Sequence, residues 1–164
     1  MIHAVLYEPE IPQNTGNIIR TCAAFSVQLH LIEPFSFYLD EAHVKRAGMD
    51  YRDIADIRIH SGWDEFCREC DGELYFTSRY GSRTPDSFTY PTDRDLYFVF
   101  GKESSGIPKP ILKANLDRCI RIPMDAKARC LNVSNTAAIV LYEALRQRQF
   151  EGLSFTEQLK QGVL

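Results

Sequence analysis

Short apolar runs separated by polar loops recur along the whole chain. Each run is almost continuously hydrophobic and rich in β-branched or aromatic residues, a pattern typical of strands that are buried on both faces of a sheet. The runs that predict strands are residues 2–7, 28–33, 56–60, 73–78, 95–100 and 119–123.

Between these runs, apolar residues recur at helical spacing. The longest such segment, residues 135–149, carries an apolar stripe on one face, made of Ala138, Leu141, Tyr142 and Leu145. Strands that alternate with helices predict an α/β fold with a mostly parallel sheet flanked by helices, and 164 residues suit one domain, residues 1–164. The other predicted helices are residues 17–25, 41–47, 63–70 and 109–114, and residues 154–161 are expected to form a last turn or to fray.

The composition is that of an ordinary soluble protein, with 45% hydrophobic and 25% charged residues. No apolar run approaches the roughly 18 residues that cross a bilayer, and the first ten residues lack the basic flank of a signal peptide. We therefore expect a cytoplasmic protein that makes no use of a membrane. The net charge of −3 excludes general attraction to polyanions, so nucleic-acid binding would need a local basic patch.

The five cysteines are an odd number in a chain long enough to fold without cross-links, so a disulfide framework is not expected. Cys67 and Cys70 form one isolated CxxC motif. A zinc site would need a second pair, for which Cys119 and Cys130 are wrongly spaced. Helix packing is the preferred interpretation of the motif, catalysis or metal binding is the alternative, and no metal cofactor is expected.

Ligands of open α/β sheets bind beyond the carboxyl ends of strands, where three loops of this chain carry unusual residues. In the first loop, residues 8–22, Asn14 and Gly16 precede the predicted helix and Arg20 lies in its second turn. Backbone amides at a helix start favour an anion such as an RNA phosphate, which an arginine can also grip. The alternative is a helix cap followed by a solvent-exposed arginine.

The second loop, residues 100–110, carries Gly101, Glu103 and Gly106 directly after an apolar strand. Glycine permits close backbone approach to a ligand and a positive φ. The spacing fits neither the GxGxxG fingerprint nor a Walker A loop, so a nucleotide bound in either of those ways is not expected. A plain connection rich in proline and glycine is the alternative.

The third loop leads from the last predicted strand into the long helix. Ser134 or Asn135 is expected to cap that helix, because serine and asparagine side chains accept hydrogen bonds from the first backbone amides. Capping does not explain Asn132, which is therefore a candidate for binding a ligand. The alternative for Ser134 is a purely structural role as the cap.

Three motifs stand in these loops in a fixed order. They are N-x-G-N-x-x-R at residues 14–20, G-x-E-x-x-G-[IL]-P at residues 101–108, and I-P-M followed by L-N-V-S-N within residues 122–135. Together they resemble the motifs of the SPOUT methyltransferases, and more narrowly those of the TrmL (YibK) group in the TrmH-like branch. The resemblance extends over nearly the whole chain and includes LIEPFSF (31–37), RAGMDY (46–51) and LNVSNTAAIVLYEALRQ (131–147).

The resemblance implies a sheet whose C-terminal segment forms a deep trefoil knot, a rare feature that no periodicity predicts. It also implies S-adenosylmethionine as the methyl donor, bound by the second and third loops. Cys130 stands where the family commonly has serine, so a backbone contact to the donor would survive whereas a side-chain hydrogen bond would weaken. The implied donor pocket consists of Thr77, Gly101, Ile122, Cys130, Leu131 and Asn132.

The implied reaction is methylation of a tRNA ribose 2′-hydroxyl, at the wobble nucleotide 34 of the anticodon stem-loop, as cytidine or a modified uridine. In the family, Arg20 is the residue assigned to activating the hydroxyl. Since arginine is not a free base, we expect it to bind the adjacent phosphate and to stabilise the developing alkoxide. The residues implied to line the same site are Asn14, Glu103, Asn132 and Ser134.

Family members dimerise through their first and last helices, so a homodimer is expected. The alternatives are methylation of ribosomal RNA, a non-catalytic RNA-binding assembly factor, and a flavodoxin-like nucleotide binder, the last of which leaves residues 131–135 unexplained. The residues expected to contact RNA are Arg20, Lys45, Arg46, Arg129 and Tyr142, with Arg52, Arg146 and Arg148 as further candidate cations.

Overall fold

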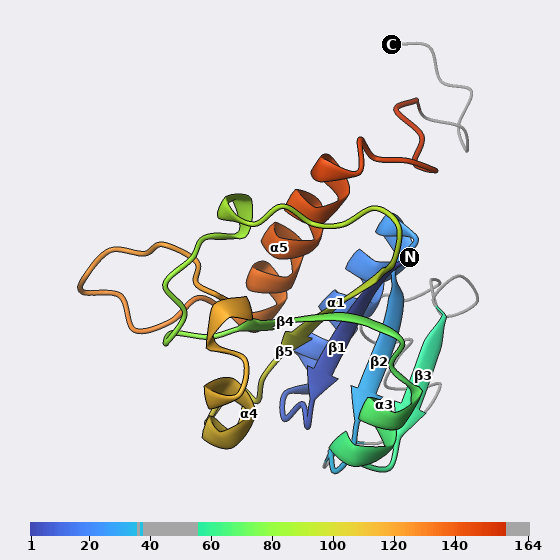
Figure 1. The fold of residues 1–164 in the computed structure, drawn as a ribbon. Coiled ribbons are helices and arrows are strands. Elements are labelled where there is room, and N and C mark those ends of the chain that lie inside the picture. Colours follow the sequence, from blue (N-terminus) through green and yellow to red (C-terminus); the bar gives the residue numbers. More distant parts are fainter. Residues whose placement is uncertain (36, 38–55, 157–164) are drawn as a thin grey trace.

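The computed structural model describes residues 1–35, 37 and 56–156, and six strands of this part form one sheet (Figure 1). Their order is β3-β2-β1-β5-β4-β6, and every pairing is parallel. The α/β fold with a parallel sheet flanked by helices is thus confirmed. The strands are β1 (Ile2–Tyr7), β2 (Gln28–Ile32), β3 (Ile57–His60), β4 (Gly72–Thr77), β5 (Asp95–Phe100) and β6 (Cys119–Ile120).

Helices cover both faces of this sheet. The α-helices are α1 (Pro12–Phe25), α3 (Trp63–Glu69), α4 (Lys109–Lys113) and α5 (Val133–Gln147), and the 3-10 helices are η1 (Pro85–Ser87) and η2 (Leu116–Arg118). Helices α1 and α5 pack against each other beside β1, and Figure 1 shows α3 next to β3. No helix in the described part of the chain is long and apolar enough to cross a membrane.

Strand β1 contributes to two hydrophobic cores, because successive side chains of a strand point to opposite faces. Ala4 and Leu6 pack in the core that α1 and α5 cover. Val5 and Tyr7 pack in the second core, together with Phe66 of α3. Burial on both faces explains why the strand segments are continuously apolar in the sequence.

Helix α1 begins at Pro12, five residues before its predicted start. Proline suits the first helical position, since its φ is already helical and its missing N–H would have no partner there. Asn14 and Gly16, which we expected to precede the helix, are therefore buried within its first turns. The last strand also differs from the prediction, since β6 covers only Cys119–Ile120 of the predicted strand 119–123.

Two predicted helical segments are not seen in the described residues. The predicted helix 41–47 lies outside them, as do residues 157–161 of the expected last turn. Residues 154–156, which are described, are not helical.

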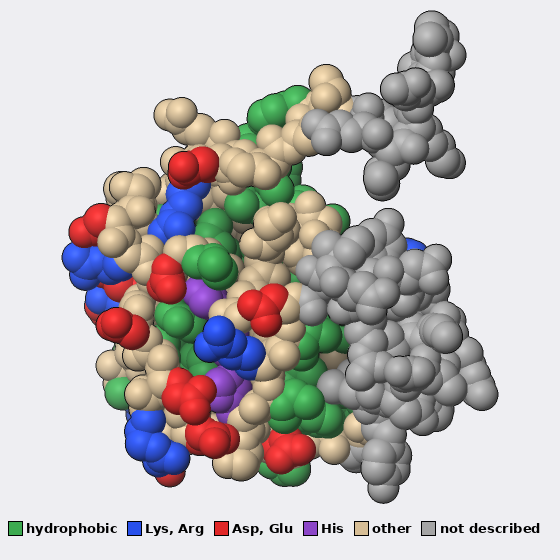
Figure 2. All heavy atoms as spheres, turned by 90° about the vertical axis from the view of Figure 1, so that its right-hand side faces the viewer, with side chains coloured by type: hydrophobic (Ala, Val, Ile, Leu, Met, Phe, Trp, Pro, Cys, Tyr) green, Lys and Arg blue, Asp and Glu red, His purple; other side chains and the backbone are tan. Residues whose placement is uncertain are grey.

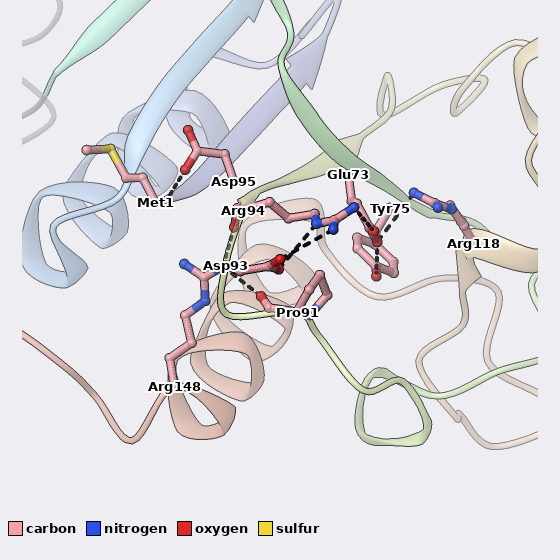
Figure 3. Close-up of polar contacts among 9 residues, drawn as sticks. All are labelled: Met1, Glu73, Tyr75, Pro91, Asp93, Arg94, Asp95, Arg118 and Arg148. Carbon is pink, nitrogen blue, oxygen red and sulfur yellow. Dashed lines mark hydrogen bonds and ion pairs between the residues drawn. The ribbon is translucent and has the colours of Figure 1, made fainter.

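A polar cluster ties the end of α5 to the strands (Figure 3). The Arg148 guanidinium, just beyond α5, donates to the carbonyl oxygens of Pro91 at 2.9 Å and Arg94 at 2.7 Å. Glu73 of β4 accepts from the Tyr75 hydroxyl and pairs with the guanidinium groups of Arg94 and Arg118. Arg148, one of the candidate RNA-binding cations, thus fixes the loop that leads into β5.

A matched pair of isoleucines tests the packing of the α3-side core. Ile32 of β2 is 0% exposed and Ile59 of β3 is 55% exposed. Ile32→Val should lower the free energy of unfolding by about 0.5–1.5 kcal/mol through the lost methyl group, whereas Ile59→Val should change it by less than about 0.5 kcal/mol. Both changes keep a β-branched residue, so urea unfolding compares burial alone, and equal effects would contradict the assignment of the core.

Candidate active site

The three motif loops follow strand ends that meet at one edge of the sheet. The first loop follows β1, and the second follows β5, its hydrogen-bonded neighbour. The third lies between β6 and α5, and α5 packs on both α1 and β1. The topology therefore brings together segments that are about a hundred residues apart in the sequence.

A continuous chain of side-chain hydrogen bonds joins these loops. The Asn14 amide nitrogen donates to Glu103 Oε1 at 3.0 Å. The Asn132 amide nitrogen donates to Asn14 Oδ1 at 2.9 Å, and Asn132 Oδ1 accepts from the Ser134 hydroxyl at 2.6 Å. Four of the residues implied to line the site thus form one network, which we call the asparagine network (Glu103, Asn14, Asn132 and Ser134).

Asn132 is the N-cap of α5, which corrects the expectation that Ser134 or Asn135 caps this helix. Its Oδ1 accepts from the backbone N–H groups of Ser134 at 2.8 Å and Asn135 at 3.4 Å. The sequence suggested that capping does not explain Asn132, and this is wrong. The same amide group has two roles, because its oxygen caps the helix while its nitrogen binds Asn14.

The start of α1 lies against an anion that belongs to the protein itself. The Glu103 carboxylate accepts from the backbone N–H groups of Glu10 at 2.9 Å and Ile11 at 3.3 Å, directly before the helix. Ile11 is the N-cap residue and makes no side-chain capping bond. A carboxylate therefore lies where the sequence suggested an RNA phosphate.

A second set of contacts, which sequence reasoning missed, holds the first loop on the second. The Glu10 carboxylate accepts from the Ser104 backbone N–H and from the Ser104 hydroxyl, each at 2.8 Å. These bonds, the backbone one foremost, lower the pKa of Glu10 below its usual value. Lys102 forms an ion pair with Glu8. Two glutamates directly after a buried strand were a signal that this loop makes polar contacts. Nothing in the local sequence indicates that the partners are more than ninety residues away.

Arg20 lies on α1, six residues after Asn14, and its side chain is exposed. It is therefore carried by the same helix as the asparagine network. Arg129 is exposed in the segment before α5, and Tyr142 of α5 is 52% exposed. Arg146 is paired with Glu143 at 2.7 Å. The candidate cations Lys45, Arg46 and Arg52 lie outside the described residues.

The residues implied to hold a methyl donor come from strand ends and from the third loop. Thr77 ends β4 and its hydroxyl donates to the Val99 carbonyl at 3.1 Å, beside Gly101 at the end of β5. A Cβ on Gly101 would collide with the backbone of Gly106 and Ile107, because the loop folds back onto itself. The other members are Ile122, Asn132 at the start of α5, and Cys130 and Leu131, which lie just before Asn132. Cys130 is exposed.

A mostly apolar hollow of about 540 Å³ lies beside α5, where η1, residues 122–123 and the end of α1 meet that helix. Ile122 lines it together with Phe25 of α1 and with Ile139 and Tyr142 of α5. Ile139 and Tyr142 are both exposed. Of the residues implied to hold the donor, Ile122 is the one that lines this hollow, which opens on a face of α5.

The CxxC cysteines lie at the end of α3, away from these loops. Cys67 is exposed, and Cys70 packs partly against the core beneath α3. Burial raises the pKa of both thiols, that of Cys70 to about 11, so both are protonated at neutral pH. In the described part of the chain, no cluster of three or more His, Cys, Asp or Glu side chains is arranged to hold a metal ion.

Comparison with known proteins agrees with the order of the motifs and with the fold. The profile of the SpoU rRNA Methylase family matches residues 1–142. This chain belongs to that family. The resemblance noted in the sequence is thus confirmed at the level of the family, and it rests on most of the chain.

Individual relatives match almost end to end. A tRNA (cytidine(34)-2′-O)-methyltransferase from Burkholderia ambifaria is 44% identical, and the match covers 93% of this chain and 99% of the relative. A solved structure from Bacillus anthracis has a TM-score of 0.89 at 46% identity, covering 94% of this chain and 99% of that one. Another, described as showing 2-OH methylation of C/U34 on tRNA, has a TM-score of 0.82 at 37% identity, covering 91% of each chain.

The double role of Asn132 can be tested by mutation. Asn132→Ala should lower the free energy of unfolding by about 2–4 kcal/mol, since it removes a helix cap worth about 1 kcal/mol and leaves the amide oxygen of the buried Asn14 without its donor, which costs about 1–3 kcal/mol. Asn132→Asp should recover the capping part alone, because aspartate also caps helices but cannot donate to Asn14.

Asn135→Ala is the matched control for this prediction, since Asn135 is exposed and its side chain takes no part in the network. Urea unfolding measures all three variants. If Asn132→Ala costs no more than Asn135→Ala, the network does not stabilise the fold.

Proposed function

We propose that this protein methylates the ribose 2′-hydroxyl of the wobble nucleotide, position 34, of tRNA, with S-adenosylmethionine as methyl donor. The observation that carries the proposal is the asparagine network, which joins all three motif loops of a SpoU family member at one edge of the sheet. Relatives named for methylation of cytidine 34 match over more than nine tenths of this chain.

The residues present fit the donor. The loop after β5 folds back so tightly that the backbone of Gly106 and Ile107 occupies the place of a Cβ on Gly101, so only glycine keeps this loop shape at the strand end. We assign the donor to Thr77, Gly101, Ile122 and the stretch 130–132. A solved SpoU methyltransferase from Streptomyces viridochromogenes, at 24% identity and a TM-score of 0.73, supports the fold for such a pocket and is described as a complex with AdoMet. When bound, the donor supplies an already activated methyl group on a sulfonium.

The protein then has mainly to orient the ribose and to stabilise charge. The 2′-hydroxyl is a poor nucleophile that loses its proton during attack. We propose that Arg20 binds the phosphate next to that ribose and stabilises the developing alkoxide, because a guanidinium donates hydrogen bonds but does not accept a proton. The asparagine network positions α1, and with it Arg20, relative to the second and third loops.

The anticodon loop suits this site as a substrate. Nucleotides of a single-stranded loop can be splayed out, so their 2′-hydroxyl is presented without opening a duplex. We assign RNA contacts to Arg129 and Tyr142 among the described residues, and to Lys45 and Arg46 beyond them. Ribosomal RNA, which the family description names, is the second candidate substrate.

We also propose that the protein is a cytoplasmic homodimer of single-domain chains, residues 1–164, each with a trefoil knot in its C-terminal part. The exposed Ile139 and Tyr142 beside the apolar hollow support pairing through α1 and α5. Such an interface would place Arg20 near the donor site of the partner. A stable interface of this kind buries more than about 1,000 Å² in total.

Replacement of Arg20 tests the mechanism. Arg20→Ala should abolish nearly all methylation of a tRNA transcript while the donor affinity, measured by calorimetry, changes by no more than about threefold. Arg20→Lys should not restore the activity, since lysine lacks the planar fork of donors. Arg68→Ala, an exposed arginine on α3, is the control and should leave turnover unchanged.

The substrate is tested in the same assay. A transcript with a 2′-deoxyribose at position 34 should accept no methyl group, and rising salt should weaken methylation steeply if several cations bind the phosphates. Transfer to the deoxy transcript at an equal rate, or preference for ribosomal RNA, would refute the proposed substrate. Equal loss of donor binding in Arg20→Ala would refute the assigned role of Arg20.

Glu10 should act as a positioning residue for the donor loop. Glu10→Ala removes the acceptor for both Ser104 donors, so we expect the KM for the donor to rise several-fold with the KM for tRNA unchanged. Glu10→Gln, which keeps an acceptor oxygen, should recover part of the loss. The exposed Glu151→Ala is the control, and a rise in both KM values together would show a general structural effect instead.

A further inference from the structure

Three buried histidines form a row across three neighbouring strands. His3 Nδ1 lies 3.0 Å from His30 Nε2, and His30 Nδ1 lies 2.9 Å from His60 Nε2. All three side chains are at most 4% exposed, and they stand on β1, β2 and β3 on the face that α3 covers. We call these three residues the histidine row.

Each end of the row faces a carboxylate. Asp95 Oδ2 of β5 lies 3.3 Å from His3 Nε2, and Glu69 Oε2 of α3 lies 3.5 Å from His60 Nδ1. Asp95 also receives the N-terminal ammonium of Met1, as Figure 3 shows. The row is therefore a closed sequence of four contacts, with a group at each end that only accepts hydrogen bonds when ionised.

Counting protons shows what this arrangement requires. Four contacts need four N–H groups, but three neutral imidazoles supply only three. One contact must therefore lack its proton, and we assign this to the contact between His60 and Glu69, which at 3.5 Å is the longest of the four. In the neutral row every ring then carries its proton on Nε2, and the lone pair of His60 Nδ1 faces Glu69.

We propose that the histidine row is a binding site for a single proton. The proton enters at His60 Nδ1 and completes the fourth hydrogen bond, the one to Glu69, so that an unbroken row of hydrogen bonds joins Asp95 to Glu69. A second proton is excluded, because five N–H groups in four contacts would place two of them head to head across a gap of about 3 Å. Three buried histidines thus take up one charge together.

The surroundings support a limit of one positive charge. Burial lowers the pKa of His3 below its usual value and that of His30 to about 3, so the middle ring does not carry a charge of its own. The Met1 ammonium and Arg58 of β3 also oppose protonation of His3, whereas Asp95 favours it.

The remaining neighbours are acidic or neutral. Glu65 and Glu69 of α3 both lie near His60. Tyr97, stacked on His3, and Cys70 are neutral, because burial raises the pKa of each. Figure 2 shows small areas of histidine surface on this side of the molecule, between Lys or Arg side chains and Asp or Glu side chains. The histidine row is thus bordered by charges of both signs.

The row makes stability depend on pH with a definite sign. In the unfolded chain each histidine has a pKa of about 6.5, so near pH 5 the three bind about three protons, whereas the folded row binds one at most. The unfolded state then holds at least two more protons, and stability is complete above about pH 6.5 and falls below it. From these residues alone, the folding equilibrium constant should fall at least about 100-fold for each pH unit that is lowered near pH 5.

Nitrogen-15 NMR of histidine-labelled full-length protein tests the proposal directly. At pH 8 the three row histidines should show the tautomer protonated at Nε2. On acidification their shifts should move together, by an amount that corresponds to one proton for three rings. Three separate full titrations in the folded protein, no uptake before unfolding, or Nδ1-protonated tautomers would each overturn the proposal.

A pair of variants on α3 provides the second test. Glu69→Gln removes the charge that faces His60 Nδ1 and should move the shared proton uptake to lower pH. Glu65→Gln removes a charge one helical turn earlier on α3. It should move the proton uptake by clearly less, because Glu69, and not Glu65, forms the ion pair with His60. Equal shifts in the two variants would show that His60 Nδ1 is not the entry point.

Discussion

The direction of the Asn14 amide governs the geometry of the site. An ionised carboxylate can only accept, so Glu103 requires the Asn14 amide nitrogen to face it. The Asn14 oxygen must then accept from Asn132, whose own oxygen is left to cap α5. One carboxylate therefore fixes the orientation of two amides and the start of the longest helix. Since Asn14 is buried, reversing any member would leave a polar group without a partner, at a cost of about 1–3 kcal/mol.

The same constraint orders the other face of the sheet. There, Asp95 gives the histidine row its direction in the neutral state, because His3 must donate to it. In the asparagine network and in the histidine row alike, a carboxylate at one end sets the direction of the hydrogen bonds, but the two differ in the number of protonation states. Amides keep their protons at any physiological pH, so the asparagine network has one state. Imidazoles exchange theirs near neutrality, so the histidine row has two.

The sequence predicted the parts of this structure that depend on local pattern. The strand segments were recognised because burial on both faces makes them continuously apolar, and the motif residues were recognised by their order. The start of α1 was missed because Gln13–Asn17 contains the residue types of a turn, and only its contact with Glu103 shows why a helix is stable there. The role of Asn132 was missed for a related reason, since its second partner is 118 residues away.

The histidine row could not be predicted from sequence either, although each of its members stands in a predicted strand segment. A single histidine among apolar residues gives no sign of a partner. The row exists because β1, β2 and β3 are neighbours in the sheet and because of their register. His30 lies beside Val5 of β1 and Arg58 of β3, so it is offset by two residues from both His3 and His60. Strand order is a property of the whole chain, which local pattern does not contain.

Strand β1 connects the two polar systems and limits how they influence each other. His3 belongs to the histidine row, while the loop that follows Tyr7 supplies Glu10 and the start of α1. Between them, β1 is hydrogen-bonded to β2 on one side and to β5 on the other. A strand held on both edges and packed on both faces has little freedom to shift. A proton gained by the row therefore acts on the stability of the folded state rather than on the alignment of Asn14 with Glu103. At pH values where the protein stays folded, the pH dependence of methyl transfer then reports the chemistry of the ribose and its donor.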